Sequence, residues 1–487
     1  MSKQPFSLVR QVLQPAPAAL NAEQASVVTH RGSPIIVQGG PGTGKTTVLV
    51  EAALARIQDG QNPDSILLLT YGRERASELR DAIALRTTKT MFEPLARTFH
   101  SLAFSILKMK AKGDPDPILL SGPEQESYIR ELLQGDIEDG FKEWPEDLHK
   151  ALTTNGFARE LRDLILRASE RGINADELAK LGAQEGEKYW QAAAAFWKRY
   201  LNSMVMREIS AQDAKLRIDP SELVSRASIH LRNNPDLLDQ LRSRFTTIMV
   251  DEFQDTNDLQ YKWLKLLAGT QGAVFAVGDD DQSMYRFRGA TVELFSEFPQ
   301  RFQKKFKKTA QQHFLRTNYR STQNIVAFVN KYATIDSSFQ KVRVKGKPPL
   351  VSGSSLVGSP VLGMFRDSPS DLASDLAELI RKVTFGHGYD IGNSERITLG
   401  SNGAVGDIAL LTFSPKEQSG DKARFPLLLK NELARGSNSI EVFNPRGQVL
   451  GSVPKIEMIL GLMLLCIDND GAIEGTLNTS READSRV

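Results

Sequence analysis

The stretch GGPGTGKTT, residues 39–47, follows the apolar run Ile35-Ile36-Val37, whose residue types favour a buried strand. Gly39, Gly44, Lys45 and Thr46 stand at the G-x-x-x-x-G-K-[ST] spacing of a phosphate-binding loop, and they follow a strand as that motif requires. In such a loop backbone N–H groups surround the phosphates, the lysine reaches the outer phosphates and the hydroxyl binds Mg²⁺. A glycine-rich turn without a ligand is the plain alternative, but it explains neither the lysine nor the hydroxyl. The stretch therefore predicts a nucleotide site.

The composition is that of a globular chain with several domains. It has 487 residues, of which 40% are hydrophobic and 25% charged. The 61 Lys and Arg residues nearly balance the 59 Asp and Glu residues, so a nucleic-acid site must be a local groove. Cys466 is the single cysteine, which excludes an intrachain disulfide and suits a reducing cytoplasm. The N-terminal residues lack a continuous apolar segment, and the apolar stretch 456–467 is too short to span a bilayer. We expect a cytoplasmic location.

Alternating patterns predict an α/β fold. Strand-like runs at 34–37 and 65–70 alternate with helical patterns from Lys45 and through 76–83. Such alternation indicates a parallel sheet with helices on both faces, and it places the loop at the carboxyl edge of its strand, where these folds bind ligands.

The pattern changes twice further along the chain. Helical periodicity from 108 to 217 predicts an inserted subdomain with helices at 124–133, 157–168, 175–181 and 189–200. Strand-like runs at 246–250 and 273–277 then resume the sheet. Beyond residue 331 we expect strands at 360–365 and 407–413, a helix at 371–383 and a loop at 386–406.

Acidic residues follow one of the resumed strands directly. Asp251 and Glu252 come after 246–250, where a phosphate-loop enzyme holds Mg²⁺ and polarises the water that attacks the γ-phosphate. We assign the metal role to Asp251 and the general-base role to Glu252; a solvated acidic turn is the alternative. Gln282, which follows the strand 273–277, is expected to sense the γ-phosphate.

Three further features are candidates for contact with a ligand. Tyr285 and Phe287 offer flat faces on which the bases of a single strand stack. The acidic triplet 279–281 suggests calcium, but the remaining ligand spacing of a calcium loop is missing, so we discount that ion. The basic residues at 343, 345 and 347 either contact a phosphate backbone or form a solvated face, which is the commoner outcome.

Seven segments carry a resemblance to a known family. In chain order they are LNAEQASVV, GGPGTGKTT, LLLTYGRERA, ARTFHSLA, IMVDEFQDTNDLQ, FAVGDDDQSMYRFRGA and LRTNYRST. They resemble the successive motifs of UvrD/Rep-type superfamily 1 DNA helicases over about residues 20–330. The insertion, with LLSGPEQESYIRELL and GFARELRDLILRASERGI, is similar to actinobacterial helicases of the AdnAB type.

The resemblance implies a domain organisation. It comprises a RecA-like motor domain in two parts (1–107 and 218–330), the helical insertion (108–217), a partial second RecA-like domain (331–470) and a tail (471–487).

The resemblance also implies roles for individual residues. Gln24 would read the adenine edge, Tyr319 would stack on the adenine and Arg320 would approach the γ-phosphate. The implied ATP-binding set is Gln24, Gly39, Gly40, Pro41, Gly42, Thr43, Gly44, Lys45, Thr46, Thr47, Tyr319 and Arg320. The implied DNA track is Thr70, Tyr71, Thr98, His100, Tyr285 and Phe287, and Gln254 and Arg288 would couple it to the ATP site. From the residues alone, Tyr71 at a strand end is more typical of core packing.

Two departures from the family pattern qualify the functional expectation. Thr47 stands where many relatives have an arginine, and no T-x-H-x-x-K-G-like or V-A-x-T-R-A-like segment follows Arg320. The resemblance therefore implies a C-terminally truncated helicase, and it leaves ATP hydrolysis by this chain alone open.

The expected function is an ATP-dependent helicase or translocase on single-stranded DNA, moving 3′ to 5′, in DNA repair or recombination. The alternative is a non-catalytic nucleotide- and DNA-binding module of a larger helicase–nuclease assembly with a partner protein.

Overall fold

The computed structural model describes most of the chain between residues 19 and 444. The described ranges are 19–89, 91–109, 116–210, 215–220, 222–269, 273–283, 290–291, 293–306, 310–335, 343–344, 346–386, 388–392, 395–397, 408–412, 417–419, 422–436 and 438–444. The chain divides into two compact units, Met1–Leu356 and Val357–Val487. Among the described helices, none is both long and apolar enough to cross a bilayer.

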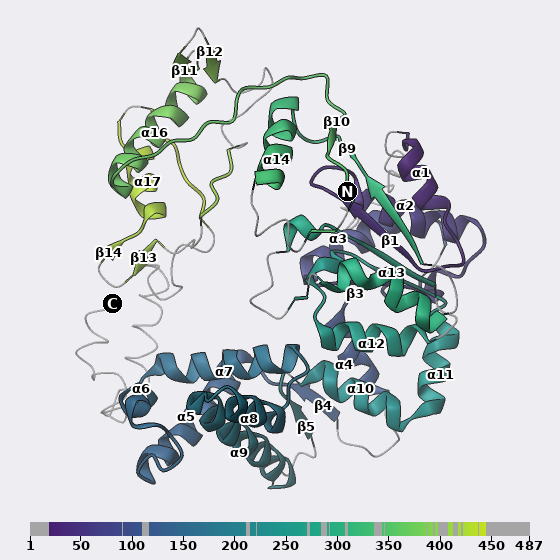
Figure 1. Ribbon diagram of the computed structural model, residues 1–487, viewed down its shortest axis with the longest axis vertical. Helices are drawn as coiled ribbons and strands as arrows, with labels where there is room; N and C mark the ends of the chain where they lie inside the picture. The colour runs from purple at the N-terminus through teal and green to yellow at the C-terminus, as the bar shows by residue number, and fades with distance from the viewer. Residues whose placement is uncertain are drawn as a thin grey trace, which may run out of the picture. The chain divides into compact units, whose positions relative to one another are not determined.

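A six-stranded parallel sheet forms the centre of the first unit (Figure 1). Its order is β3-β2-β6-β7-β1-β8, and every neighbouring pair is parallel. The strands are β1 (Ile35–Gly39), β2 (Ile66–Thr70), β3 (Ala96–Thr98), β6 (Thr247–Val250), β7 (Ala273–Gly278) and β8 (Gln311–Leu315). The predicted α/β class and parallel sheet are confirmed.

Helices cover both faces of this sheet because successive strand residues, which point to opposite faces, are both apolar. Ile35 and Val37 of β1 pack with α1, α2 and α3 on one face, whereas Ile36 packs in the core formed with α4, α10, α11, α12 and α13 on the other. These helices are α1 (Ala22–Thr29), α2 (Lys45–Gln58), α3 (Arg73–Ala84), α4 (Phe99–Lys108), α10 (Leu223–Asn233), α11 (Pro235–Arg244), α12 (Asp258–Ala268) and α13 (Glu293–Phe306). Burial on both sides explains why the strands are continuous apolar runs.

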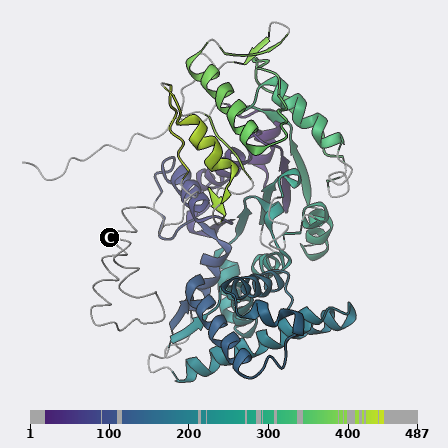
Figure 2. The same ribbon diagram turned by 90° about the vertical axis from the view of Figure 1, so that its left-hand side faces the viewer.

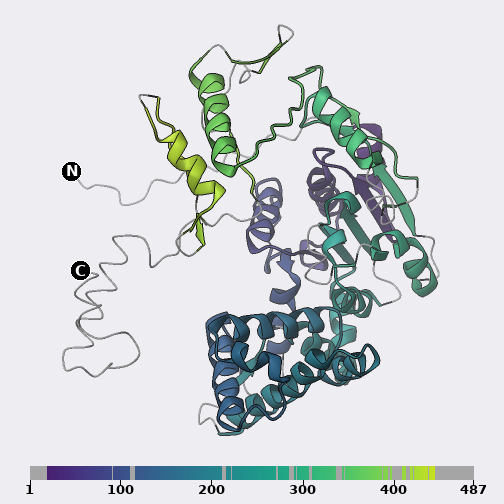
Figure 3. The ribbon, with the colours of Figure 1, turned by 60° about the vertical axis from the view of Figure 1, so that its left-hand side comes forward.

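The predicted helical insertion forms a bundle with its own core (Figure 3). Its helices are α5 (Gly122–Glu138), α6 (His149–Leu152), α7 (Asn155–Glu170), α8 (Ala175–Gln184) and α9 (Lys188–Ser210). The four helices expected from periodicity are confirmed. A parallel strand pair that the sequence analysis did not predict, β4 (Asp116–Leu119) with β5 (Lys215–Ile218), brings the two ends of the insertion together.

Short elements complete the first unit. Among the described residues they are the 3₁₀ turns η1 (Pro63–Ser65), η2 (Glu146–Leu148), η3 (Phe253–Asp255) and η4 (Asp280–Gln282), the parallel pair β9 (Thr317–Asn318) and β10 (Val351–Ser352), and α14 (Gln323–Ile335). The first compact unit runs to Leu356, 26 residues past the boundary predicted after residue 330.

The second unit is built around two helices that pack side by side, α16 (Pro369–Phe385) and α17 (Phe425–Leu433) (Figure 2). The helix predicted at 371–383 is confirmed by α16. The loop predicted at 386–406 is partly wrong, because β11 (Tyr389–Gly392) and β12 (Glu395–Ile397) form an antiparallel hairpin there. A second hairpin joins β13 (Gln418–Ser419) and β14 (Lys422–Ala423).

The strands predicted at 360–365 and 407–413 are wrong for the described residues 360–365 and 408–412. A strand requires a second strand beside it as a hydrogen-bonding partner, in addition to an apolar run. Neither of these two segments is paired with another strand among the described residues. Their side chains are accordingly uncovered: Phe365 is 87% exposed and Leu411 is 94% exposed.

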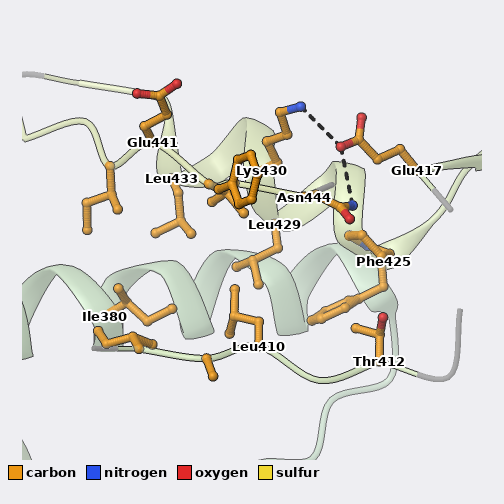
Figure 4. A pocket seen from close by; sticks show the side chains of 16 residues that line it. Ile380, Leu410, Thr412, Glu417, Phe425, Leu429, Lys430, Leu433, Glu441 and Asn444 are labelled. Carbon is orange, nitrogen blue, oxygen red and sulfur yellow. Dashed lines mark hydrogen bonds and ion pairs between the residues drawn. The ribbon is translucent and has the colours of Figure 1, made fainter. Parts of the chain in front are cut away.

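A cavity of about 480 Å³ lies within the second unit (Figure 4). Ile380 of α16 and Phe425, Leu429 and Leu433 of α17 line it. Polar side chains, among them Thr412 and Glu441, also line it, and Glu417 Oε1 accepts hydrogen bonds from Lys430 Nζ at 3.1 Å and Asn444 Nδ2 at 3.4 Å (Figure 4). A largely apolar lining whose lysine is already paired does not suit a triphosphate.

Candidate nucleotide-binding site

The predicted loop lies directly after β1, and its glycines adopt conformations that other residues avoid. Gly42 and Gly44 have φ of +69° and +84°. A Cβ atom on Gly42 would lie 2.7 Å from Arg320 Cβ, and one on Gly44 would lie 2.7 Å from Gln24 Nε2. Glycine therefore allows both the turn and the close approach of its neighbours. The α2 helix begins at Lys45, so its N-terminal N–H groups face the loop, as an anion requires.

A cavity of about 540 Å³ opens at this loop. Its lining brings together residues that the sequence analysis assigned to nucleotide binding and catalysis: Gln24, Gly40, Pro41, Gly42, Gly44, Lys45, Thr46, Thr47, Glu252, Gln282, Tyr319 and Arg320. Ala19, Leu20 and Arg75 complete it. Most of these residues follow the carboxyl ends of strands, which meet at one edge because the sheet is parallel, whereas Gln24 lies on α1 ahead of β1.

Lys45 is held on the loop itself. Its Nζ donates hydrogen bonds to the carbonyl oxygens of Gly39 at 2.8 Å and Gly40 at 3.2 Å, and lies 4.0 Å from Asp279 Oδ2. Thr43 also closes the loop, since its Oγ1 donates to Gly40 O at 2.9 Å. The ammonium group is therefore already directed to the place where a phosphate-binding loop receives its outer phosphates.

Hydrogen bonds join the other wall of the cavity to the loop. Asn318 Nδ2 donates to Pro41 O at 2.7 Å, and Tyr319 N donates to Gly42 O at 2.9 Å. Asn318 Oδ1 accepts from Arg320 N at 2.9 Å. Asn318 was missed from the sequence, although it lies inside the quoted segment LRTNYRST.

Gln24 and Tyr319 lie at the end of the cavity expected to receive the base. The buried Gln24 accepts a hydrogen bond from Asn21 N through Oε1 and donates to Thr43 O through Nε2, both at 3.1 Å. Asn21 in turn donates from Nδ2 to Tyr319 OH at 2.7 Å. With 51% of the residue exposed, the Tyr319 ring is available for stacking.

The two predicted metal ligands share one partner. Arg75 donates from Nε to Asp251 Oδ2 at 2.9 Å and from Nη2 to Thr46 Oγ1. Within the described residues no hydrogen bond reaches the buried Asp251 Oδ1. Burial raises the pKa of Asp251, the Arg75 charge opposes this shift, and the Glu252 charge adds to it. A hydroxyl close to a carboxylate with an open oxygen atom is a donor set that fits Mg²⁺.

Glu252 has a strained backbone and a fixed side chain. Its φ of +48° is in the left-handed region, which is uncommon for residues other than glycine and is found at functional sites. Glu252 Oε2 accepts from Gln254 Nε2 at 2.9 Å, and Gln254 Oε1 accepts from Asp279 N at 2.9 Å. Asp279 Oδ2 accepts from Gln282 Nε2. Gln254 thus connects the segment after β6 with the segment after β7.

The acidic triplet is neutralised by lysine and arginine. Lys347 Nζ contacts carboxylate oxygens of Asp279 and Asp280 and lies 2.8 Å from Asp281 Oδ2, while Arg343 Nε lies 3.2 Å from Asp281 Oδ1. The Lys347 side chain is only 5% exposed. The solvated-face interpretation is therefore wrong for Arg343 and Lys347, and their contact with DNA stays a prediction; Lys345 lies outside the described residues.

The described residues of the predicted DNA track lie at the same edge of the sheet, and their side chains differ in exposure. Thr70 and Thr98 are opposite each other in the β2–β3 register and buried, and Thr98 Oγ1 caps α4 by accepting from Ser101 N at 3.1 Å. His100 is exposed on the first turn of α4. Their contact with DNA stays a prediction.

Tyr71 has the features of core packing that the residue pattern suggested. Its ring centroid is 5.4 Å from that of Phe99, and its hydroxyl hydrogen-bonds Thr256 Oγ1. Burial raises the pKa of Tyr71 well above the usual value, and the Thr256 hydrogen bond opposes this. Tyr285, Phe287 and Arg288 lie outside the described residues.

The chain matches one family model and several proteins whose names agree with that family. Residues 20–303 match the UvrD/REP helicase N-terminal domain. The chain is 33% identical over 317 residues to DNA helicase II of Escherichia coli, covering 64% of this chain and 40% of that protein. It is 30% identical over 341 residues to the putative ATP-dependent DNA helicase YjcD of Bacillus subtilis, covering 67% and 41%. With UvrD1 of Mycobacterium tuberculosis it shares 26% identity over 388 residues, covering 76% and 46%.

The chain thus spans less than half the length of these relatives. The family match nevertheless covers more than half of the chain, including the loop, Asp251, Glu252 and Gln282. The chain belongs to the UvrD/Rep helicase family.

Proposed function

We propose that this chain is an ATP-dependent motor that moves on single-stranded DNA and separates DNA strands. The observation that carries the proposal is the single cavity of about 540 Å³ in which the phosphate loop, Glu252, Gln282 and Arg320 meet. The names of the relatives, DNA helicase II and ATP-dependent DNA helicase, support the same activity.

In this proposal each residue has a defined task in ATP hydrolysis. Lys45 leaves the carbonyl oxygens of its own loop and donates to the outer phosphates. Glu252 accepts a proton from the attacking water, and Arg320 stabilises the negative charge that develops on the γ-phosphate. Thr46 and Asp251 would hold Mg²⁺, which when bound neutralises charge on the outer phosphates.

The connection from Glu252 to Asp279 supports coupling between ATP and DNA. When the γ-phosphate changes the position of Glu252 or Gln282, Gln254 carries the change to the backbone after β7, because it bonds both segments. The chain after β7 leads to Tyr285 and Phe287, the proposed base platform. Movement in the 3′ to 5′ direction, a role in repair or recombination, a helicase–nuclease partner and a cytoplasmic location belong to the same proposal.

The test is ATP turnover measured with and without single-stranded DNA, in the wild type and in Glu252→Gln. We expect DNA-stimulated hydrolysis that falls by at least about 100-fold in the variant, the lower range for loss of a general base. Binding of a fluorescent ATP analogue should be retained, because Glu252 is assigned no contact with the triphosphate. Binding without turnover in the wild type would instead support the alternative of a non-catalytic module, and the absence of both would refute the nucleotide site.

A further inference from the structure

Arg75 is a cavity residue to which the sequence analysis gave no role. It is the third residue of α3, and its side chain, 30% exposed, reaches from the surface into the cavity. The guanidinium donates to Asp251 Oδ2 at 2.9 Å, to Thr46 Oγ1, and to Glu78 Oε2 at 3.1 Å. Two of these three acceptors are the predicted metal ligands, and the third lies outside the cavity.

Arg75 and Mg²⁺ cannot use these two oxygens in the same way at once. Mg²⁺ binds oxygen ligands at about 2.0–2.1 Å in a near-octahedral arrangement, and a guanidinium group already hydrogen-bonded to both oxygens occupies the space between them. Full coordination by Thr46 Oγ1 therefore requires Arg75 to move away from it. Glu78, on the next turn of α3 with a largely exposed side chain, provides a partner for the displaced guanidinium.

The buried carboxylate of Asp251 requires a neighbouring positive charge when no metal is bound. Its side chain is 1% exposed, and its second oxygen, Oδ1, has no hydrogen-bond partner among the described residues. A buried carboxylate without a neighbouring positive charge is strongly unfavourable. Arg75 is the cation in contact with it, so the arginine compensates the same charge that the metal would compensate.

We propose that Arg75 is a positioning residue that acts as a stand-in cation: it holds Thr46 and Asp251 together in the nucleotide-free chain and is displaced when Mg²⁺ binds with the nucleotide. This inference rests on the proposed nucleotide site. Its consequence is competition between one side chain and one ion. Removing the guanidinium makes the chain more dependent on Mg²⁺, in contrast to a residue that only anchors α3.

The competition is measured by the dissociation constant of N-methylanthraniloyl-ATP in EDTA divided by that in Mg²⁺. In Arg75→Gln this ratio should exceed the wild-type ratio by at least about tenfold, which corresponds to the lower end of the range for a hydrogen bond to a charged group. Binding in EDTA weakens because a cation near the phosphates is lost, and binding in Mg²⁺ tightens because nothing must be displaced. Arg80→Gln is the matched control, since Arg80 lies on the same helix and donates to Ala96 O at 3.1 Å, away from both predicted metal ligands.

If the ratio of the dissociation constant in EDTA to that in Mg²⁺ is no higher in Arg75→Gln than in the wild type, the inference is overturned. This holds even if the variant melts at a lower temperature, because loss of stability alone is what a purely structural arginine would give. Arg75→Lys keeps a cation that reaches one ligand, so its ratio should lie between the two; it replaces Arg75→Gln if the latter does not fold.

Melting of the nucleotide-free protein with Mg²⁺ alone separates the two proposals. If the wild type binds no analogue in either buffer, the proposed function fails. The stand-in role still predicts a larger Mg²⁺-induced rise in melting temperature for Arg75→Gln than for the wild type, and an equal or smaller rise refutes it.

Discussion

Gly42 joins the two walls of the nucleotide cavity, and its replacement by alanine tests whether their close contact matters. The residue has φ of +69°, and an added Cβ would lie 2.7 Å from Arg320 Cβ and 3.0 Å from Asn318 Oδ1. Arg320 Cβ is attached directly to the backbone, so rotation of the side chain cannot relieve the contact. The segment 318–320 must move away from the loop.

The expected cost of Gly42→Ala has two parts. A non-glycine residue in the left-handed region costs roughly 1–2 kcal/mol. Displacement of residues 318–320 breaks the hydrogen bonds from Asn318 Nδ2 to Pro41 O and from Tyr319 N to Gly42 O. At about 1 kcal/mol each, these bonds bring the total loss of unfolding free energy to roughly 3–4 kcal/mol.

Gly32→Ala provides the matched control. Gly32 has φ of +84°, and a Cβ there meets no atom within 4 Å, so only the backbone cost of about 1–2 kcal/mol applies. Denaturant unfolding gives the two stability losses, and titration with a fluorescent ATP analogue gives the affinities. Gly42→Ala should lose more stability and bind the analogue at least about tenfold more weakly, whereas Gly32→Ala keeps the wild-type affinity. If the two variants lose equal stability and bind the analogue equally well, the close contact between Gly42 and residues 318–320 does not matter for the cavity.

Two further substitutions probe buried charges near the site. Burial, with a smaller effect of the Glu252 charge, raises the pKa of Asp255 to about 7. Because this folded pKa lies above the unfolded value, protonation of Asp255 stabilises the folded protein. The unfolding free energy of the wild type, relative to that of Asp255→Asn, should therefore rise by up to about 4 kcal/mol as the pH falls from 8 to 4, which denaturant unfolding at several pH values measures. An opposite slope would contradict the burial of this carboxyl. Lys347→Met leaves three carboxylates without their shared lysine and should cost about 3–5 kcal/mol at pH 7.5, less at pH 5, while the exposed Lys331→Met should cost almost nothing. Similar losses for both lysine variants would show that the triplet is solvated.

Sequence patterns predicted the elements whose burial is local and continuous. The runs that form β1, β2, β6 and β7 are apolar because both faces of the sheet are covered. Each run is apolar by itself, so each can be recognised without knowing its neighbours in the sheet. The loop spacing carries its own geometry, so the positions of Lys45 and Thr46 at the start of α2 followed directly. At 360–365 the apolar run was equally suggestive, but a strand also depends on a neighbour elsewhere in the chain.

Arg75 and Lys347 show what such patterns cannot give. Within the charged segment RERASELR, Arg75 reads as one more exposed helix residue, and its partner Asp251 is 176 positions away. Lys347 similarly reads as part of a basic run, whereas its partners precede it by 66 to 68 positions in the acidic triplet. Pairing across such distances depends on topology, which residue types alone do not encode. The signal that could have raised the question is the place of Arg75 in the first turn of the helix after β2, because β2 is the neighbour of β6, whose carboxyl end carries Asp251.

The hydrogen bond between Asn21 and Tyr319 has a consequence for how the chain assembles during synthesis. The two residues are 298 positions apart, and β1 pairs only with β7 and β8, which also come late in the chain. At a synthesis rate of about 5–20 residues per second, Asn21 is made roughly 15–60 s before Tyr319. Until β7 is made, both edges of the strand that carries the phosphate loop are unpaired. The nascent chain is therefore most exposed to misassociation when about 250 residues have been made and β7 and β8 have not. We infer that the nucleotide pocket is among the last parts of the first unit to form.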